Sequence, residues 1–316
     1  MGPGRSGDTA EGRPVRLGVC TACFGEVPLP EVLRWAGDAG FDAVDVPAPP
    51  LRRPDAWHHS SALAVAALDG PGRDAFLSGL EEAGLAVACL ASDVPLLDAD
   101  ADRADRAREH LVQVVEMAGV LGVPMVRLPV LRMGPMSAGD AITETARRLE
   151  PVLARAEAGG VRLAVETDPH LGRDRPDTPA GAAFCPELWE KLFTHVRTET
   201  VGLALDPGAL LWQGIDPVSA LTDYAEKVFH LPARDAETLA LRRQDCGILR
   251  PGGGWWRYRL PGLGEVDWRR LLDRARELGV AATLAIDHAD PTYRADPKAV
   301  KSGLALSRRL LAQWMG

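Results

Sequence analysis

The sequence predicts a single-domain α/β protein with the (βα)8 TIM-barrel fold. Apolar runs of four to six residues alternate along the chain with longer amphipathic segments. Each run is too short for a helix and is bounded by proline, glycine or aspartate, which is typical of a strand buried on both faces. Because helices connect successive strands, the strands must be parallel, and eight such units favour a closed barrel over an open doubly wound sheet.

The first half of the chain predicts four strand–helix units. We expect strands over residues 15–20, 41–46, 85–90 and 125–128, each followed in turn by one of the helices over residues 31–39, 74–83, 102–121 and 141–158. A glycine stands where a left-handed C-cap would end each helix, at Gly40, Gly84, Gly122 and Gly159.

The second half predicts four further units. Its strands are the runs LAVETD, VGLALDPG, KVFHLPARD and TLAIDHAD, and its helices cover residues 186–196, 216–225, 268–278 and 297–314. Asp216 is a typical N-cap, and Pro217 then occupies the first helical position. No GxGxxG motif follows the first strand, which again favours the barrel.

Length and charge limit the function. With 316 residues and 46% hydrophobic content, residues 15–316 can form one barrel domain, and we expect residues 1–14 to be a disordered leader. A formal charge of −8 argues against nucleic acid or an anionic membrane as partner and favours a small-molecule substrate. No apolar stretch approaches a membrane span, so we expect a cytoplasmic protein. The subunit number stays open, a homo-oligomer included.

Five cysteines are an odd and sparse set, which suits a reducing compartment. Cys20 and Cys23 form a CxxC at the end of the first strand, but no second CxxC accompanies them. We therefore expect them to pack in the structure rather than to bind zinc or act as a redox pair.

Four strands of the second half each deliver an acidic or imidazole side chain near their C-terminal ends. These residues are Glu166, Asp206, His230 and Asp287. Because the C-terminal ends of barrel strands meet at one mouth, we expect the carboxylates to converge there as an acid/base site.

The runs LAVETDP, VGLALDPGALLWQGIDP, VFHLPARDAE, GWWRYRLPGLGEVDW and TLAIDHADP resemble the sugar phosphate isomerase/epimerase superfamily, the xylose-isomerase-like TIM barrels. The resemblance covers nearly the whole chain. It implies an enzyme that holds one divalent metal with a Glu, an Asp, a His and a second Glu after the last four strands. The metal polarises a carbonyl or hydroxyl pair, and the two Glu residues move protons.

This chain matches that pattern only in part. Glu166 and Asp206 stand at the first two ligand positions, Asp287 replaces the second Glu, and Pro232 replaces the usual ligand histidine. The resemblance thus implies a metal held by Glu166, Asp206 and Asp287, with His230 as fourth ligand, and this oxygen-rich set favours Mn²⁺ or Mg²⁺. In a metal-free site, crowded carboxylates should raise the pKa of at least one of them.

Further candidates for substrate binding lie on the same side of the predicted barrel. They are Asp168, Trp212, His230, Arg234, Arg259 and His288. For Arg234 a local ion pair with Asp235 is slightly favoured over a substrate contact. Trp212 belongs to an aromatic group with Trp255, Trp256 and Tyr258 that either stacks on a ligand or packs loops together. We expect His58 and His59 to be solvated in a loop.

Three functions remain open. The first is an isomerase or epimerase of a sugar-like polyol or ketone, with Glu166 and Asp287 as acid/base groups and Asp206 as ligand or orienting group. The second is a metal-independent lyase, dehydratase or cyclase acting on a specialised metabolite. The third is a non-catalytic small-molecule-binding relic.

Overall fold

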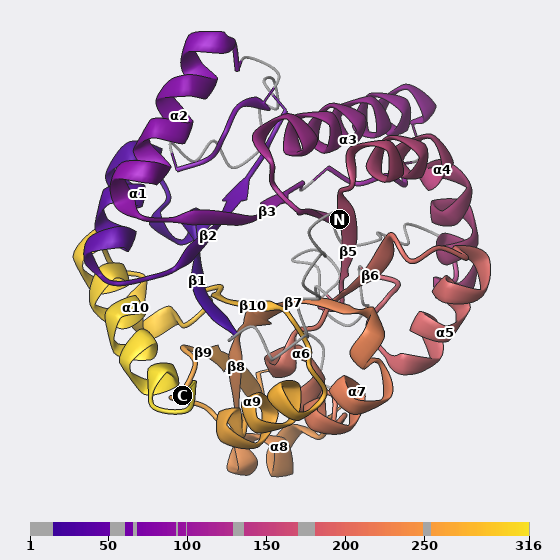
Figure 1. Cartoon of the computed structure of the whole chain (residues 1–316). Coiled ribbons are helices and arrows are strands. Elements are labelled where there is room, and N and C mark those ends of the chain that lie inside the picture. The colour runs from indigo at the N-terminus through magenta and orange to yellow at the C-terminus, as the bar shows by residue number, and fades with distance from the viewer. Residues whose placement is uncertain are drawn as a thin grey trace, which may run out of the picture.

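The predicted barrel is confirmed. The computed structural model describes residues 15–50, 61–65, 68–92, 94–98, 100–128, 136–169, 181–248 and 254–315. Figure 1 shows a ring of strands surrounded by helices. The expected leader over residues 1–14 lies outside the described residues, as do His58 and His59.

Eight parallel strands form the ring. They are β1 (Arg16–Cys20), β2 (Ala43–Pro47), β3 (Ala86–Ala91), β4 (Met125–Leu128), β5 (Arg162–Glu166), β6 (Val201–Ala204), β7 (Val228–Ala233) and β10 (Thr283–Ile286). Their order around the closed barrel is β1, β10, β7, β6, β5, β4, β3 and β2. Each strand coincides with one of the predicted apolar runs to within four residues at its ends.

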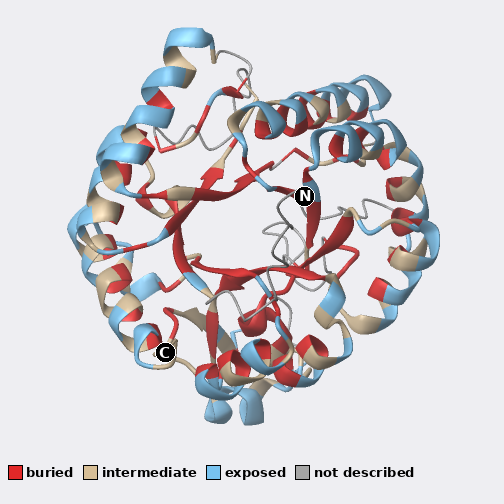
Figure 2. Ribbon diagram, viewed as in Figure 1, coloured by how far each residue is buried: buried red, intermediate tan, exposed pale blue. Residues whose placement is uncertain are grey.

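The predicted helices also lie where the sequence places them. They are α1 (Leu29–Asp38), α2 (Gly70–Ala83), α3 (Ala101–Leu121), α4 (Ala138–Gly159), α5 (Pro186–His195), α7 (Pro217–Asp223), α9 (Trp268–Glu277) and α10 (Pro297–Ala312). Figure 2 shows buried strands at the centre and helices whose outer faces are exposed. No helix in the described part of the chain is long and apolar enough to cross a membrane.

Several short elements between β6 and α9 were not predicted. They are α6 (Pro207–Trp212), α8 (Ala240–Cys246), the strands β8 (Asp235–Thr238) and β9 (Trp256–Arg259), and the 3₁₀ segment η3 (Ala225–Lys227). Two further 3₁₀ segments, η1 (Thr21–Phe24) and η4 (Pro291–Tyr293), lie elsewhere in the chain. These elements have three to seven residues, too few for the periodicity on which the prediction relies.

The antiparallel hairpin of β8 and β9 is fastened to the barrel by Asp235. Its carboxylate accepts hydrogen bonds from the backbone N–H of Gly262 at 3.0 Å, from that of Val266 at 2.9 Å and from Trp268 Nε1 at 2.8 Å. Because a buried carboxylate needs such donors, this network fixes where the hairpin stands relative to the barrel. The hairpin in turn places the aromatic residues of β9 beside the C-terminal ends of the strands.

Candidate functional site

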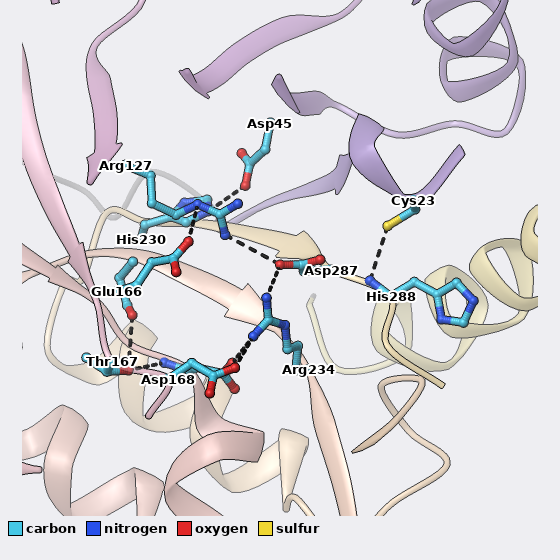
Figure 3. A network of polar contacts seen from close by, with 12 residues as sticks. Cys23, Asp45, Arg127, Glu166, Thr167, Asp168, His230, Arg234, Asp287 and His288 are labelled. Carbon is cyan, nitrogen blue, oxygen red and sulfur yellow. Dashed lines mark hydrogen bonds and ion pairs between the residues drawn. The ribbon is translucent and has the colours of Figure 1, made fainter. Parts of the chain in front are cut away.

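Charged side chains meet at the mouth formed by the C-terminal ends of the strands (Figure 3). Glu166 is the last residue of β5, Arg234 follows β7 and Asp287 follows β10. Asp206 lies just beyond β6 and is the N-cap of α6, where its Oδ1 accepts the backbone N–H of Ala209 at 3.0 Å. Sequence positions more than a hundred residues apart therefore share one small volume.

Arg234 lies between three carboxylates. Its Nη1 is 2.5 Å from Asp168 Oδ2 and 3.1 Å from Asp206 Oδ2, and its Nη2 is 2.5 Å from Asp287 Oδ2. The predicted ion pair between Arg234 and Asp235 is wrong. Successive residues of an extended chain point to opposite sides, so Asp235 turns towards the hairpin while Arg234 turns into the mouth.

Arg127, which the sequence reasoning missed, is a second guanidinium in the site. It lies within β4, and its Nε is 3.2 Å from Glu166 Oε1 while its Nη1 is 3.5 Å from Asp287 Oδ2. A charged residue inside the otherwise apolar run MVRL is the signal that could have found it, because an arginine is almost never buried without a partner.

Asp206 has an unusual protonation equilibrium. Its pKa is raised to about 7, mainly by burial and also by the nearby Asp168 and Asp287, against the opposing effects of Arg234 and the Ala209 N–H. The expectation that one crowded carboxyl would have a raised pKa is thus confirmed. Thr167 fixes the backbone here, since its Oγ1 accepts the Asp206 N–H at 2.9 Å and donates to Ala204 O at 3.1 Å.

Asp287 behaves in the opposite way. Burial alone would raise its pKa, but the guanidinium groups of Arg234 and Arg127 outweigh burial and hold the pKa well below its ordinary value. The carboxylates of Asp287, Asp206 and Asp168 keep the pKa of Arg234 well above the usual range despite its burial. The mouth therefore combines a permanently ionised carboxylate with a carboxyl that exchanges its proton near neutral pH.

His230 lies in a separate, fully buried cluster with Asp45 and Cys89. Its Nε2 is 2.7 Å from Asp45 Oδ2, and the potential ligand atoms of the three residues lie within 4.8 Å of one another. Asp45 Oδ1 and His230 Nδ1 have no hydrogen-bond partner in the described part of the chain. His230 is thus directed to Asp45, a residue that sequence reasoning did not select, rather than serving as fourth ligand beside the three carboxylates.

An aromatic group borders the charged site. Tyr258 donates a hydrogen bond to Asp168 Oδ2 at 3.0 Å and accepts one from Trp212 Nε1 at 3.4 Å. The rings of Trp212 and Trp256 are stacked, with centroids 4.2 Å apart and 3° between the planes. The group therefore connects to the carboxylates through Asp168, whereas Trp255 is turned away and donates to Ile248 O at 3.3 Å.

Arg259 and His288, both predicted to bind substrate, are engaged in loop contacts. Arg259 Nε is 2.9 Å from Asp290 Oδ2, and its Nη1 is 2.7 Å from Glu237 Oε2. The His288 ring nitrogens contact Asp290 N at 3.1 Å and Tyr293 O at 3.1 Å, and burial lowers the pKa of this imidazole. The structure gives both side chains a bracing role around the hairpin and the end of β10.

The predicted metal-ligating carboxylates do not fit a divalent ion in this arrangement. Mg²⁺ would lie roughly 2.0–2.1 Å from each ligand oxygen. Asp206 and Asp287 instead point Oδ2 atoms at the cationic group of Arg234, which occupies the space between them. An ion and a guanidinium cannot share that space, because like charges at such short range repel strongly.

The buried cluster of Asp45, Cys89 and His230 offers a different donor set, with one oxygen, one sulfur and one nitrogen. This combination suits Zn²⁺ better than Mg²⁺ or Mn²⁺. Cysteine binds zinc as a thiolate. Burial is the main reason why the pKa of the Cys89 thiol lies well above its ordinary value, so the thiolate is disfavoured here. The hydrogen bond between Asp45 and His230 also engages two of the three donors, so the cluster fits a zinc ion poorly as it stands.

Comparison with known proteins agrees with the geometry of the fold. Residues 33–310 match the family described as the xylose isomerase-like TIM barrel. The chain belongs to this family. YfiH of Bacillus subtilis (strain 168), an uncharacterised protein, is 23% identical over 321 residues, which cover 88% of this chain and 94% of YfiH.

Two solved structures illustrate the likeness in fold. The IolI protein with a bound zinc atom superposes with a TM-score of 0.72 at 16% identity, covering 95% of this chain and 99% of IolI. An L-ribulose 3-epimerase superposes with a TM-score of 0.64 at 17% identity, covering 95% of this chain and 93% of the epimerase. Both likenesses show the fold that this chain shares with these proteins.

Proposed function

We propose that the protein is an isomerase or epimerase that transfers a proton at the carbon next to a carbonyl group of a small sugar-like polyol or ketone. The observation that carries the proposal is the meeting of four carboxyl groups and two guanidinium groups at one barrel mouth. Such a mouth supplies both of the things this chemistry needs, a base for the carbon-bound proton and a cation for the developing oxyanion.

The proton transfer can be written with the residues of this chain. The Glu166 carboxylate takes the proton from the carbon, the C–H electron pair forms a carbon–carbon double bond, and the carbonyl π electrons move to the oxygen. Arg127 and Arg234 donate N–H groups to the resulting enolate oxygen. Return of a proton to the opposite face inverts the carbon. Isomerisation needs two further proton movements: the enolate oxygen takes up a proton and the hydroxyl on the neighbouring carbon gives one up, so that its carbon becomes the new carbonyl while a proton returns to the former carbonyl carbon.

Asp206 is the better proton donor for the second half of the reaction. The sequence assigned that role to Asp287, but a carboxylate held ionised by two guanidinium groups carries almost no proton at neutral pH. Asp206, with a pKa of about 7, is protonated in about half of the molecules there. We therefore propose Asp287 as the group that orients both arginines and Asp206 as the proton reservoir.

The neutral Asp206 carboxyl also favours a second candidate, a dehydratase. The same enolate would expel a hydroxyl group from the next carbon, and the proton of Asp206 would leave with it as water. The non-catalytic relic remains the third candidate.

The five cysteines are free, in keeping with the cytoplasmic location that we also propose for the protein.

Solvent exchange separates these functions. A panel of ketoses and polyol ketones is incubated with the protein in D₂O and followed by NMR, with Glu166→Gln as the inactive variant. Deuterium next to the carbonyl of an otherwise unchanged or epimerised substrate supports the isomerase or epimerase. Loss of water from the substrate favours the dehydratase, and no exchange anywhere on the panel contradicts both and favours the relic.

A further inference from the structure

We propose that the guanidinium of Arg234 is a built-in replacement for a divalent cation, so that this site works without a metal and becomes a metal site when Arg234 is removed. The proposal starts from geometry. Asp168 follows β5, Asp206 follows β6 and Asp287 follows β10, and all three direct an Oδ2 atom at one side chain. Figure 3 shows the Arg234 side chain between Asp168 and Asp287.

The charges of the site require a cation there. The side chains of Asp168, Asp206 and Asp287 are only 9%, 3% and 15% exposed, and Arg234 itself is 13% exposed. Carboxylates buried together repel one another and lose hydration, so they need a compensating positive charge. Arg234 contacts all three of them, whereas Arg127 contacts Asp287 and the fourth carboxylate, Glu166.

Arginine suits this position better than any other side chain. Its guanidinium keeps its charge at every accessible pH, and its planar fork presents two terminal nitrogens to acceptors on different sides. Nη1 contacts Asp168 and Asp206 while Nη2 contacts Asp287, so one residue spans carboxylates from three strands. A lysine ammonium is a single point of charge and would not span them in the same way.

The carboxylates that remain without Arg234 have the chemistry of a hard-cation site. Three oxygen ligands converging from a rigid barrel rim resemble the oxygen sets that bind Mn²⁺ and Mg²⁺. The arginine thus competes with a metal for the same oxygens. If the proposed function also holds, the guanidinium additionally takes the role of electrophile at the substrate oxygen, but the competition for the oxygens does not depend on that function.

The test measures Mn²⁺ binding by protein treated with chelator and then freed of it. Free Mn²⁺ is followed by electron paramagnetic resonance during titration of the wild type, Arg234→Ala and Arg234→Met. Mn²⁺ is chosen because it prefers oxygen, which keeps the Cys89 cluster out of the measurement. Arg259→Ala is the matched control, because Arg259 is also mostly buried and also bridges two carboxylates, those of Asp290 and Glu237.

We expect the two Arg234 variants to bind one Mn²⁺ at least about tenfold more tightly than the wild type and the Arg259 control. Asp287→Asn in the Arg234→Ala background should abolish the gain, which places the ion among these carboxylates. Mn²⁺ should also raise the melting temperature of the Arg234 variants and not that of the wild type.

Two results would overturn the proposal. One is a wild type that binds Mn²⁺ as tightly as the variants, with the same sensitivity to Asp287→Asn. The other is a pair of Arg234 variants that gain no binding, or that fail to fold even in excess Mn²⁺, since the ion then cannot take the place of the guanidinium. None of these readouts requires activity, so failure of the proposed function and failure of this proposal are distinguishable.

Discussion

The raised pKa of Asp206 makes the stability of the protein depend on pH in a direction opposite to that of most aspartates. The pKa is about 7 in the folded state against an ordinary value of 3.8, so the folded protein binds the proton more tightly than the unfolded chain. The stabilisation is complete below the unfolded value and is lost as pH rises towards about 7. The full effect corresponds to about 4 kcal/mol, of which about 3 kcal/mol falls between about pH 4.5 and 7.5.

Asp206→Asn removes this titration and keeps an oxygen that can accept the Ala209 N–H. Urea unfolding of the wild type and the variant at several pH values between about 4.5 and 7.5 isolates the effect, because titrating groups that do not interact with Asp206 cancel in the difference. We expect the wild type to lose about 3 kcal/mol relative to the variant as pH rises across this range. Asp38→Asn, which removes an exposed carboxyl far from the mouth, is the matched control. A difference that stays flat, or that grows in favour of the wild type, would refute the reasoning.

Three further substitutions test the contacts around the mouth. Arg127→Met leaves Glu166 without its guanidinium partner and should destabilise the protein by about 3–5 kcal/mol in urea unfolding; a loss below about 1 kcal/mol would show that this ion pair is unimportant. Asp235→Asn weakens the acceptor of five N–H groups and should lower the free energy of unfolding by about 1–3 kcal/mol, which an unchanged denaturation midpoint would contradict. Tyr258→Phe removes the hydroxyl that donates to Asp168 and should cost about 1 kcal/mol, and equal stability of variant and wild type would mean that water replaces it.

The sequence predicts the barrel well because each buried strand can be recognised from a short run of neighbouring residues. Each strand is an apolar run bounded by turn residues, and the C-terminal end of each strand then fixes which mouth Glu166, Asp206 and Asp287 face. The hairpin of β8 and β9 escapes prediction because its strands are four residues long and half of their residues are charged, unlike the apolar runs of the barrel. An alternation over only four residues does not distinguish such a segment from a loop.

The partners of the charged residues could not be predicted from the sequence. Arg234 and Asp287 are 53 residues apart and Arg127 and Asp287 are 160 apart, so their contacts depend on closure of the ring. Local reasoning paired Arg234 with its neighbour Asp235 instead. His230 lies within β7, in the predicted strand run, but its partner Asp45 lies 185 residues away. Asp45, like Arg127, is a charged residue inside an otherwise apolar run, which indicates a buried partner without saying which residue it is.

The central claim is that the carboxylates and arginines of the mouth transfer a proton next to a carbonyl without a metal ion. Deuterium incorporation from D₂O into a ketose substrate, measured by NMR before and after removal of divalent ions with a chelator, tests it most directly. We expect the same exchange rate in both samples and a rate that added Mn²⁺ does not increase. Exchange that stops on chelation and returns with Mn²⁺ or Zn²⁺ would contradict it.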